Sequence, residues 1–183
     1  MPDVERGPVE SAAEIRALYE AKTRAELAAA DSVAPGSDRV ASVGALLARV
    51  ALVKGLPGPA EVSGGAALCG PDGVAADLAL AALGHDPAGT FRLLSRPEAG
   101  IDAARRTERL RLVVEAVDPE FVIALDPEAA EDVAEAFGIA PLRFGAPVRV
   151  LGRTMLAVDG LEASLTDQAR KRRVWRQMQA LKV

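Results

Sequence analysis

From residue 66 onward, short apolar segments alternate with amphipathic helical segments, and few folds accept such a pattern. The segments that qualify as strands are residues 66–69, 91–94, 121–125 and 155–158. They lack the polar alternation of half-exposed strands, which is typical of βα units around a parallel sheet covered on both faces. The sequence therefore predicts an α/β three-layer sandwich with a four-stranded, mainly parallel sheet in the order 2-1-3-4 and right-handed crossovers.

Capping residues and helical spacing predict the helices of this sandwich. Residues 74–83 end at Gly84, and residues 102–117 carry one apolar face. Asp126 and Pro127 begin a further helix that stops at Gly138. We also expect a last helix at 166–181, and residues 148–151 to pair with 155–158 as a hairpin.

The N-terminal part of the chain lacks this alternation. Residues 11–14 have the form of a capping box, and the helix that they begin is expected to reach about residue 30. After the Pro35-Gly36 break, Ser37 is expected to cap a second helix that ends at Gly55, since apolar residues recur at helical spacing: Val40, Val43, Leu47 and Val50. We therefore expect an N-terminal helical extension over 1–58 and an α/β domain over 59–183.

Composition removes several classes of chemistry. One cysteine and one histidine cannot build a four-cysteine zinc site, a cubane cluster or a site with two imidazoles, so we expect no metal and no cofactor. Few aromatic residues and a net charge of −4 argue against dense, sequence-independent nucleic-acid binding. The acidic start of the chain and the lack of a long apolar run predict a soluble, cytoplasmic protein with no membrane association.

The loop between the first predicted strand and its helix is the leading site candidate. Ligands of open parallel sheets lie beyond the carboxyl ends of the strands, near helix N-termini. Here Gly70 and Gly73 allow close backbone approach, Pro71 begins the helix, and Asp72 is the candidate catalytic residue that orients a water or contacts a base. The alternative is that Pro-Asp-Gly forms an ordinary turn. The loop is neither a P-loop nor a dinucleotide fingerprint.

Residues after the other predicted strands fall on the same rim. Ser95 and Arg96 follow the second strand, Asp126 the third and Asp159 the fourth. Asp126 is either a helix cap or a catalytic acid. Cys69 is expected to be buried and inert, and His85 to lie on the surface.

The last predicted helix has a basic face, with Val174, Trp175 and Met178 expected to point inward. Its arginines form either a solvated surface or a phosphate-binding edge made by Arg170, Arg172 and Arg173. In the solvated case we expect them to pair with the acidic helix at 128–135.

Read in order, these segments resemble the uracil-DNA glycosylase superfamily, most closely its iron–sulfur branch in bacteria and archaea. The family has a strand that ends in a Gly-Glu-Ala/Gly-Pro-Gly loop, similar to residues 66–73, and an Arg-Pro segment, similar to 94–97. Its Pro-Lys-Val-Ile-Val-Ala-Leu-Gly phrase with an Ala-Ala pair is similar to 118–130, and its last helix to 171–175. The resemblance implies a parallel α/β fold and a DNA-facing rim.

The positions that carry the family's chemistry differ in this chain. The family's histidine, which stabilises the departing uracil anion, falls on Leu161, and the cluster cysteines are missing. The asparagine after the second strand falls near Ser95. Because an extruded base must be held by stacking and hydrogen bonds, these losses favour a non-catalytic domain that binds a partner protein or, weakly, DNA or a nucleotide.

Two alternatives stay open at this point. One is an active glycosylase or nucleotide hydrolase with a reorganised site built on Asp72, Asp126 or Asp159. The other is an unrelated nucleotide-binding α/β protein.

Overall fold

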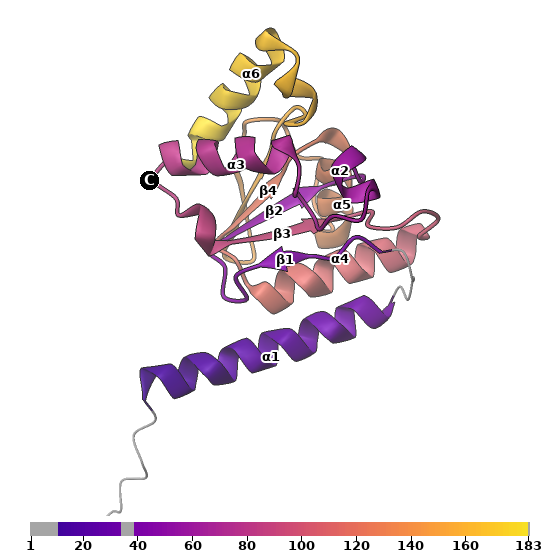
Figure 1. The fold of residues 1–183 in the computed structure, drawn as a ribbon, viewed down its shortest axis with the longest axis vertical. Coiled ribbons are helices and arrows are strands. Elements are labelled where there is room, and N and C mark those ends of the chain that lie inside the picture. The colour runs from indigo at the N-terminus through magenta and orange to yellow at the C-terminus, as the bar shows by residue number, and fades with distance from the viewer. Residues whose placement is uncertain (1–10, 34–38, 183) are drawn as a thin grey trace, which may run out of the picture.

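A six-stranded mixed sheet forms the centre of the molecule, for which a computed structural model describes residues 11–33 and 39–182 (Figure 1). The strands lie in the order β1-β3-β2-β4-β6-β5. Their bounds are β1 Val43–Gly44, β2 Val50–Lys54, β3 Thr90–Leu94, β4 Phe121–Ala124, β5 Val148–Val150 and β6 Arg153–Ala157. The four inner strands, β3-β2-β4-β6, run parallel, and β1 and β5 add antiparallel edges.

The predicted α/β class is confirmed, but the predicted number of strands and the identity of the first strand are wrong. Two edge strands extend the predicted four-stranded sheet to six. The inner strands follow the predicted spatial order, but the first of them is Val50–Lys54 and not residues 66–69. The predicted hairpin is present, with Val148 opposite Met155.

The predicted second N-terminal helix is wrong. Residues 43–44 and 50–54 are strands, and all five residues of β2 are buried. The helical spacing from Val40 to Val50 was coincidental, whereas Val50–Val53 is an unbroken apolar run that fits a strand covered on both faces. The expected cap, Ser37, lies outside the described residues. The predicted boundary at residue 58 falls after β2, so the sheet takes an inner strand from the segment predicted as an extension.

Residues 66–69, predicted as the first strand, form turns that lead into a helix. Leu68 has a left-handed backbone with φ of 55°, which a strand does not accept. The side chains of Ala67 and Leu68 are nonetheless buried, so the segment is as apolar as a strand without pairing as one.

Helices cover both faces of the sheet. Their bounds are α1 Ala12–Val33, α2 Pro59–Val62, α3 Pro71–Ala82, α4 Ala103–Val117, α5 Pro127–Phe137 and α6 Gln168–Met178. One core lies between the sheet and α4 and α5, and the other between the sheet and α3 and α6. Successive side chains of β2 alternate between the two cores: Ala51 and Val53 enter the first, Val50 and Leu52 the second.

Local capping chemistry begins and ends these helices as predicted. Ser11 and Glu14 form the capping box of α1, and Asp102 caps α4 by accepting from the backbone N–H of Arg105. Gly138, with φ of 60°, ends α5. α6 is shorter than predicted and continues as one 3-10 turn over Gln179–Leu181.

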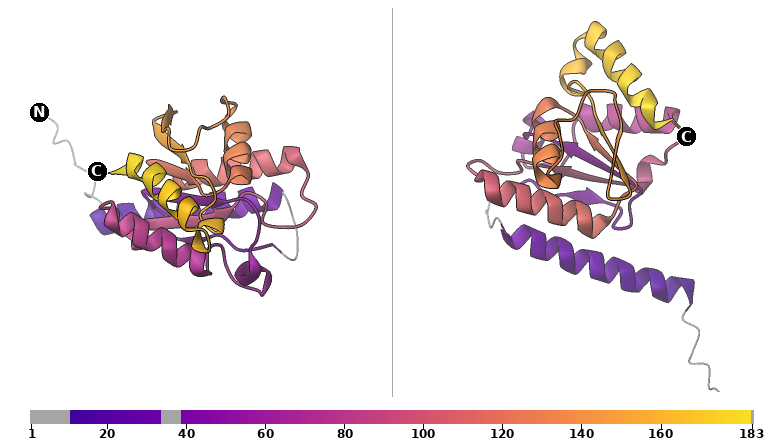
Figure 2. Two further views of the ribbon diagram at one scale, coloured as in Figure 1. Left: turned by 90° about the horizontal axis from the view of Figure 1, so that it is seen from above. Right: turned by 180° about the vertical axis from the view of Figure 1, so that it is seen from behind.

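α1 lies outside the sandwich, along α4, and its N-terminal half projects past that helix (Figures 1 and 2). The fully buried Arg109 of α4 anchors it, with 2.9 Å between Arg109 Nη2 and Asp31 Oδ1. Thr23 adds a hydrogen bond of 3.3 Å to the carbonyl oxygen of Ala116.

Candidate functional site

A buried ion cluster occupies the carboxyl end of β2, where open parallel sheets usually bind ligands. Lys54, the last residue of the strand, places its ammonium 2.7 Å from Asp72 Oδ2 and 3.0 Å from Glu162 Oε2. Glu61 Oε1 lies 3.3 Å away. Lys54, Glu61 and Asp72 are almost fully buried, whereas the side chain of Glu162 is 46% exposed. The cluster thus closes the strand end from the inside, with one carboxylate at the surface.

Glu61 connects this cluster to the surrounding loops. Its carboxylate accepts hydrogen bonds from the backbone N–H of Gly58, at 2.9 Å, and of Leu68, at 3.0 Å. Because the same carboxylate contacts Lys54, the loop after β2 and the loop before α3 are held against the strand end. The arrangement has the satisfied donors and acceptors of a structural network.

The charges of the cluster keep Lys54 protonated. Burial by itself lowers the pKa of a lysine. Here the hydrogen bonds that Lys54 donates to Asp72 and Glu162, together with the charges of Asp72 and Glu61, outweigh burial, so the pKa of Lys54 lies above its ordinary value. A lysine held in this state is a cation and not a nucleophile or base.

Asp126 borders the same strand end and caps α5. Its two carboxylate oxygens accept from the backbone N–H of Ala129, at 2.7 Å, and of Gly55, at 2.9 Å. Burial raises the pKa of Asp126 above that of an ordinary carboxyl, against the effect of these hydrogen bonds.

Between the Lys54 cluster and Asp126 remains a cavity of about 10 Å³, lined also by Leu68, Leu125 and Leu161. Small-molecule sites are typically about 300–1,000 Å³, and a volume of about 10–15 Å³ holds a single water. The strand end is filled by the protein itself.

Gly73, predicted as a place where backbone approaches a ligand, is instead a place where backbone approaches backbone. A Cβ at this position would overlap the carbonyl oxygen of Leu68. Gly70 is the N-cap residue of α3, and Pro71 is its first residue. The absence of a side chain at Gly73 therefore serves the packing of α3 against the preceding loop, and a Cβ at Gly70 would lie 3.1 Å from Ala60 Cβ of α2.

Ser95 and Arg96 lie on the α5 side of the sheet, away from Asp72. The buried Ser95 hydroxyl donates to Asp132 Oδ2 at 2.6 Å. Arg96 donates two hydrogen bonds to the same Asp132 carboxylate, of 2.8 and 2.9 Å. These bonds raise the pKa of the Arg96 guanidinium above its ordinary value. This network ties the end of β3 to α5.

The remaining predicted residues gather at α6. Asp159, after β6, forms an ion pair of 2.9 Å with Arg173. Arg172 and Arg173 are exposed and Arg170 is half-buried. Val174 and Met178 are buried as expected, but Trp175 is 38% exposed. The expected pairing of these arginines with α5 is wrong: Glu131 and Glu135 bind Arg96 and Arg106.

The structure thus brings the start of α3, with Asp72, close to Asp126, and separates both from Ser95, Arg96 and the arginines of α6. Lys54, Glu61 and Glu162 were not predicted. A lysine that ends an apolar run and precedes glycine was the available signal, but it depended on recognising β2 as a strand. Two further predictions are wrong, since His85 is buried against Leu181 and Cys69 is exposed.

No protein-family model matches this chain, and no curated protein matches it in sequence. Within residues 11–33 and 39–182, no helix is long and apolar enough to cross a membrane.

Proposed function

We propose that this chain is a non-catalytic, uracil-DNA-glycosylase-like domain that acts by binding a partner protein. The closed strand end carries the proposal. A nucleobase cannot enter a cavity of about 10 Å³, and opening it would expose a buried lysine and separate it from its carboxylates.

The acids that a reorganised hydrolase would need are all engaged. Asp72 is bound to Lys54, Asp126 holds two backbone N–H groups, and Asp159 is paired with Arg173. A general base must reach a water or substrate proton within hydrogen-bond distance. Asp72 and Asp126 line a cavity of about 10 Å³, which is far smaller than a substrate.

The position of β2 makes the loop after it more similar to the glycosylase loop motif, but the acid of that motif is missing. Since the first inner strand is β2, the family's Gly-Glu-Ala/Gly-Pro-Gly loop is more similar to Lys54-Gly55-Leu56-Pro57-Gly58 than to residues 66–73. The acid of that pattern, two residues before the proline, then falls on Gly55. A Cβ on Gly55 would lie 2.7 Å from Asp126 Oδ1 and 2.6 Å from Glu128 Cβ, so the position has no room for an acid.

The residue at the position of the family's histidine supports the same proposal. Leu161 is buried and forms part of the cavity wall. It offers no hydrogen bond to a departing anion, so transition-state stabilisation by this group is absent.

Excision of uracil from single-stranded and duplex oligonucleotides tests the proposal. We expect no uracil release by the wild-type chain, and the same result for Asp72→Asn. Multiple-turnover release that Asp72→Asn abolishes would overturn it, because Asp72 would then be a working residue of an open site. Phosphate binding by Arg170, Arg172 and Arg173 is the alternative use of α6, and it is tested separately by the salt dependence of DNA binding.

A further inference from the structure

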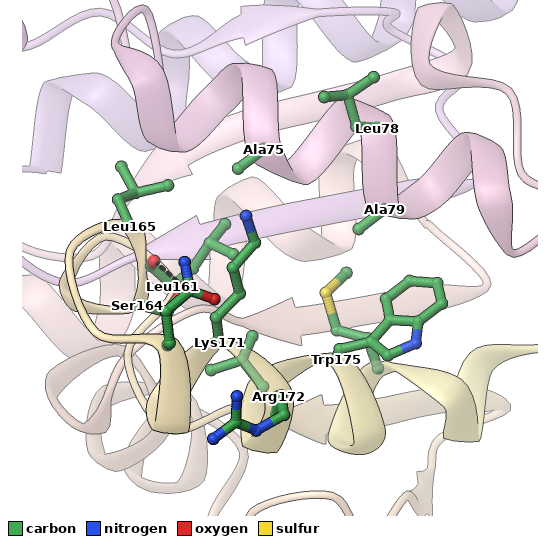
Figure 3. Close-up of a pocket in the computed structure, with 12 residues that line it drawn as sticks. Ala75, Leu78, Ala79, Leu161, Ser164, Leu165, Lys171, Arg172 and Trp175 are labelled. Carbon is green, nitrogen blue, oxygen red and sulfur yellow. Dashed lines mark hydrogen bonds between the residues drawn. The ribbon is translucent and has the colours of Figure 1, made fainter.

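A groove of about 450 Å³ separates α3 from α6, next to the closed strand end (Figure 3). Ala75, Leu78 and Ala79 line it from α3, and Trp175 and Met178 from α6. Leu161 and Leu165 close one end, as Figure 3 shows. Leu161 therefore belongs both to the wall of the closed cavity and to this groove.

Large apolar side chains remain uncovered in the groove. Leu78 is 69% exposed and Trp175 38% exposed, from opposite walls. Contiguous exposed apolar surface of this kind with a polar rim marks interaction sites. Tryptophan is also among the residues enriched in binding hot spots.

The polar rim is basic. Lys171 and Arg172 line the groove, and neither takes part in an ion pair with any residue that the structure describes. The chain from Gln168 to Val183 contains no acid. The α3 wall contributes only alanine and leucine, so the positive charge is not compensated across the groove.

We propose that this groove binds an acidic amphipathic helix of a partner protein. The inference rests on the proposed binding function and names its partner chemistry. An occupant must cover Leu78 and Trp175 with apolar side chains and bring carboxylates to Lys171 and Arg172, as an amphipathic helix does in a helical groove. Ala75 and Ala79 are small and let such a helix approach closely.

A peptide fits these walls better than single-stranded nucleic acid does. Nucleic-acid grooves combine positive charge with several aromatic platforms for stacked bases. This groove has one aromatic residue, and its other apolar walls are aliphatic. Aliphatic walls favour leucine-like anchors.

Trp175 is the only tryptophan of the chain, so selective tryptophan fluorescence reports directly on the groove. The probe is a library of helical peptides with leucine at helical i, i+3, i+4 and i+7 spacing and with Glu, Gln or Lys varied at the flanking positions. We expect selection to enrich glutamate, and the selected peptide to shift the Trp175 emission of the full chain.

Two groove variants and two matched controls locate the binding. Leu78→Ser and Lys171→Glu should each weaken the selected peptide by about tenfold or more, the loss of one good contact. Val62→Ser removes an equally exposed apolar side chain on α2, and Arg176→Glu reverses a charge of α6 outside the groove, so both should bind as the wild type does. Circular dichroism and urea unfolding check that all four variants fold.

The inference would be overturned by any of the following results: no enriched peptide, enrichment of lysine, binding that both groove variants retain, or tighter Trp175 quenching by a single-stranded DNA oligonucleotide. Concentration-dependent self-association lost in Leu78→Ser would also overturn it, by assigning the groove to a second copy of the chain. Uracil release would instead contradict the proposed function, so the two failures are distinguishable.

Discussion

At the scale of single residues, Lys54 determines what the strand end can do. It is the cation that compensates the buried carboxylates of Glu61 and Asp72, and it fills the space where a ligand of an open parallel sheet would lie. Removal of one partner from such a cluster lowers the free energy of unfolding strongly, because it leaves an unpaired charge in the interior.

Lys54→Met should therefore destabilise the fold strongly. Loss of the cation leaves two buried carboxylates uncompensated, and we expect the free energy of unfolding in urea to fall by about 3–5 kcal/mol. Glu162→Gln is the matched control: its carboxylate contacts the same ammonium but is half-exposed, so its loss should cost about 1 kcal/mol or less. Equal costs for the two variants would contradict a buried cluster.

The buried carboxyl of Asp126 should make the free energy of unfolding depend on pH. Its pKa in the fold lies above the ordinary value of 3.8 because of burial, so between these two values the folded state binds more protons than the unfolded state. The unfolding free energy contributed by Asp126 should thus fall as pH rises above 3.8 and level off once Asp126 is ionised in the fold. Urea unfolding of the wild type and of Asp126→Asn, at several pH values from 3.8 upward, measures the free energy of unfolding that Asp126 contributes. A wild-type stability that grows relative to Asp126→Asn as pH rises would contradict the raised pKa of Asp126.

At the scale of elements, local chemistry was predictable and long-range pairing was not. α4 and α5 begin and end where Asp102, Asp126 and Gly138 indicate, since caps act within one turn of helix. β2 was missed because apolar spacing before it coincided with a helical period. Lys54 has partners 7, 18 and, at Glu162, more than a hundred residues away, and no local pattern predicts such contacts.

The junction between α3 and the loop before it depends on Gly73. A Cβ would collide with the carbonyl oxygen of Leu68, which is backbone and cannot turn aside. Gly73→Ala should lower the free energy of unfolding by about 3 kcal/mol, the upper end of common overpacking costs. Gly89→Ala, where the nearest atom to an added Cβ is 3.9 Å away, is the control and should change stability little. A neutral Gly73→Ala would show that α3 does not pack closely here.

At the scale of the whole molecule, the charges of α5 and α6 are compensated to different extents. Glu131, Asp132 and Glu135 of α5 form ion pairs with Arg96 and Arg106. Among the described residues, an ion pair compensates one arginine of α6, Arg173, which contacts Asp159. The net charge of −4 opposes general DNA binding, and the apolar groove beside α6 favours a protein partner.

The double variant Arg172→Ala, Arg173→Ala tests whether α6 binds DNA or only presents a solvated basic surface. Arg172 has no ion pair among the described residues and the Arg173 side chain is 50% exposed, so the unfolding free energy should change by about 1 kcal/mol or less. We expect the wild-type chain to show no salt-sensitive DNA binding, so the double variant should leave DNA binding unchanged. Micromolar DNA affinity that falls steeply with salt and flattens in the double variant would contradict this expectation.

The closure of the strand end against a nucleobase follows from the cavity of about 10 Å³ that remains there. Its most direct test is a single-turnover reaction with the full chain in excess over single-stranded DNA that contains uracil, with free uracil detected by mass spectrometry. The closed site predicts no uracil above the level of a reaction without protein. Release of free uracil by the wild type, lost in Asp72→Asn, would contradict it.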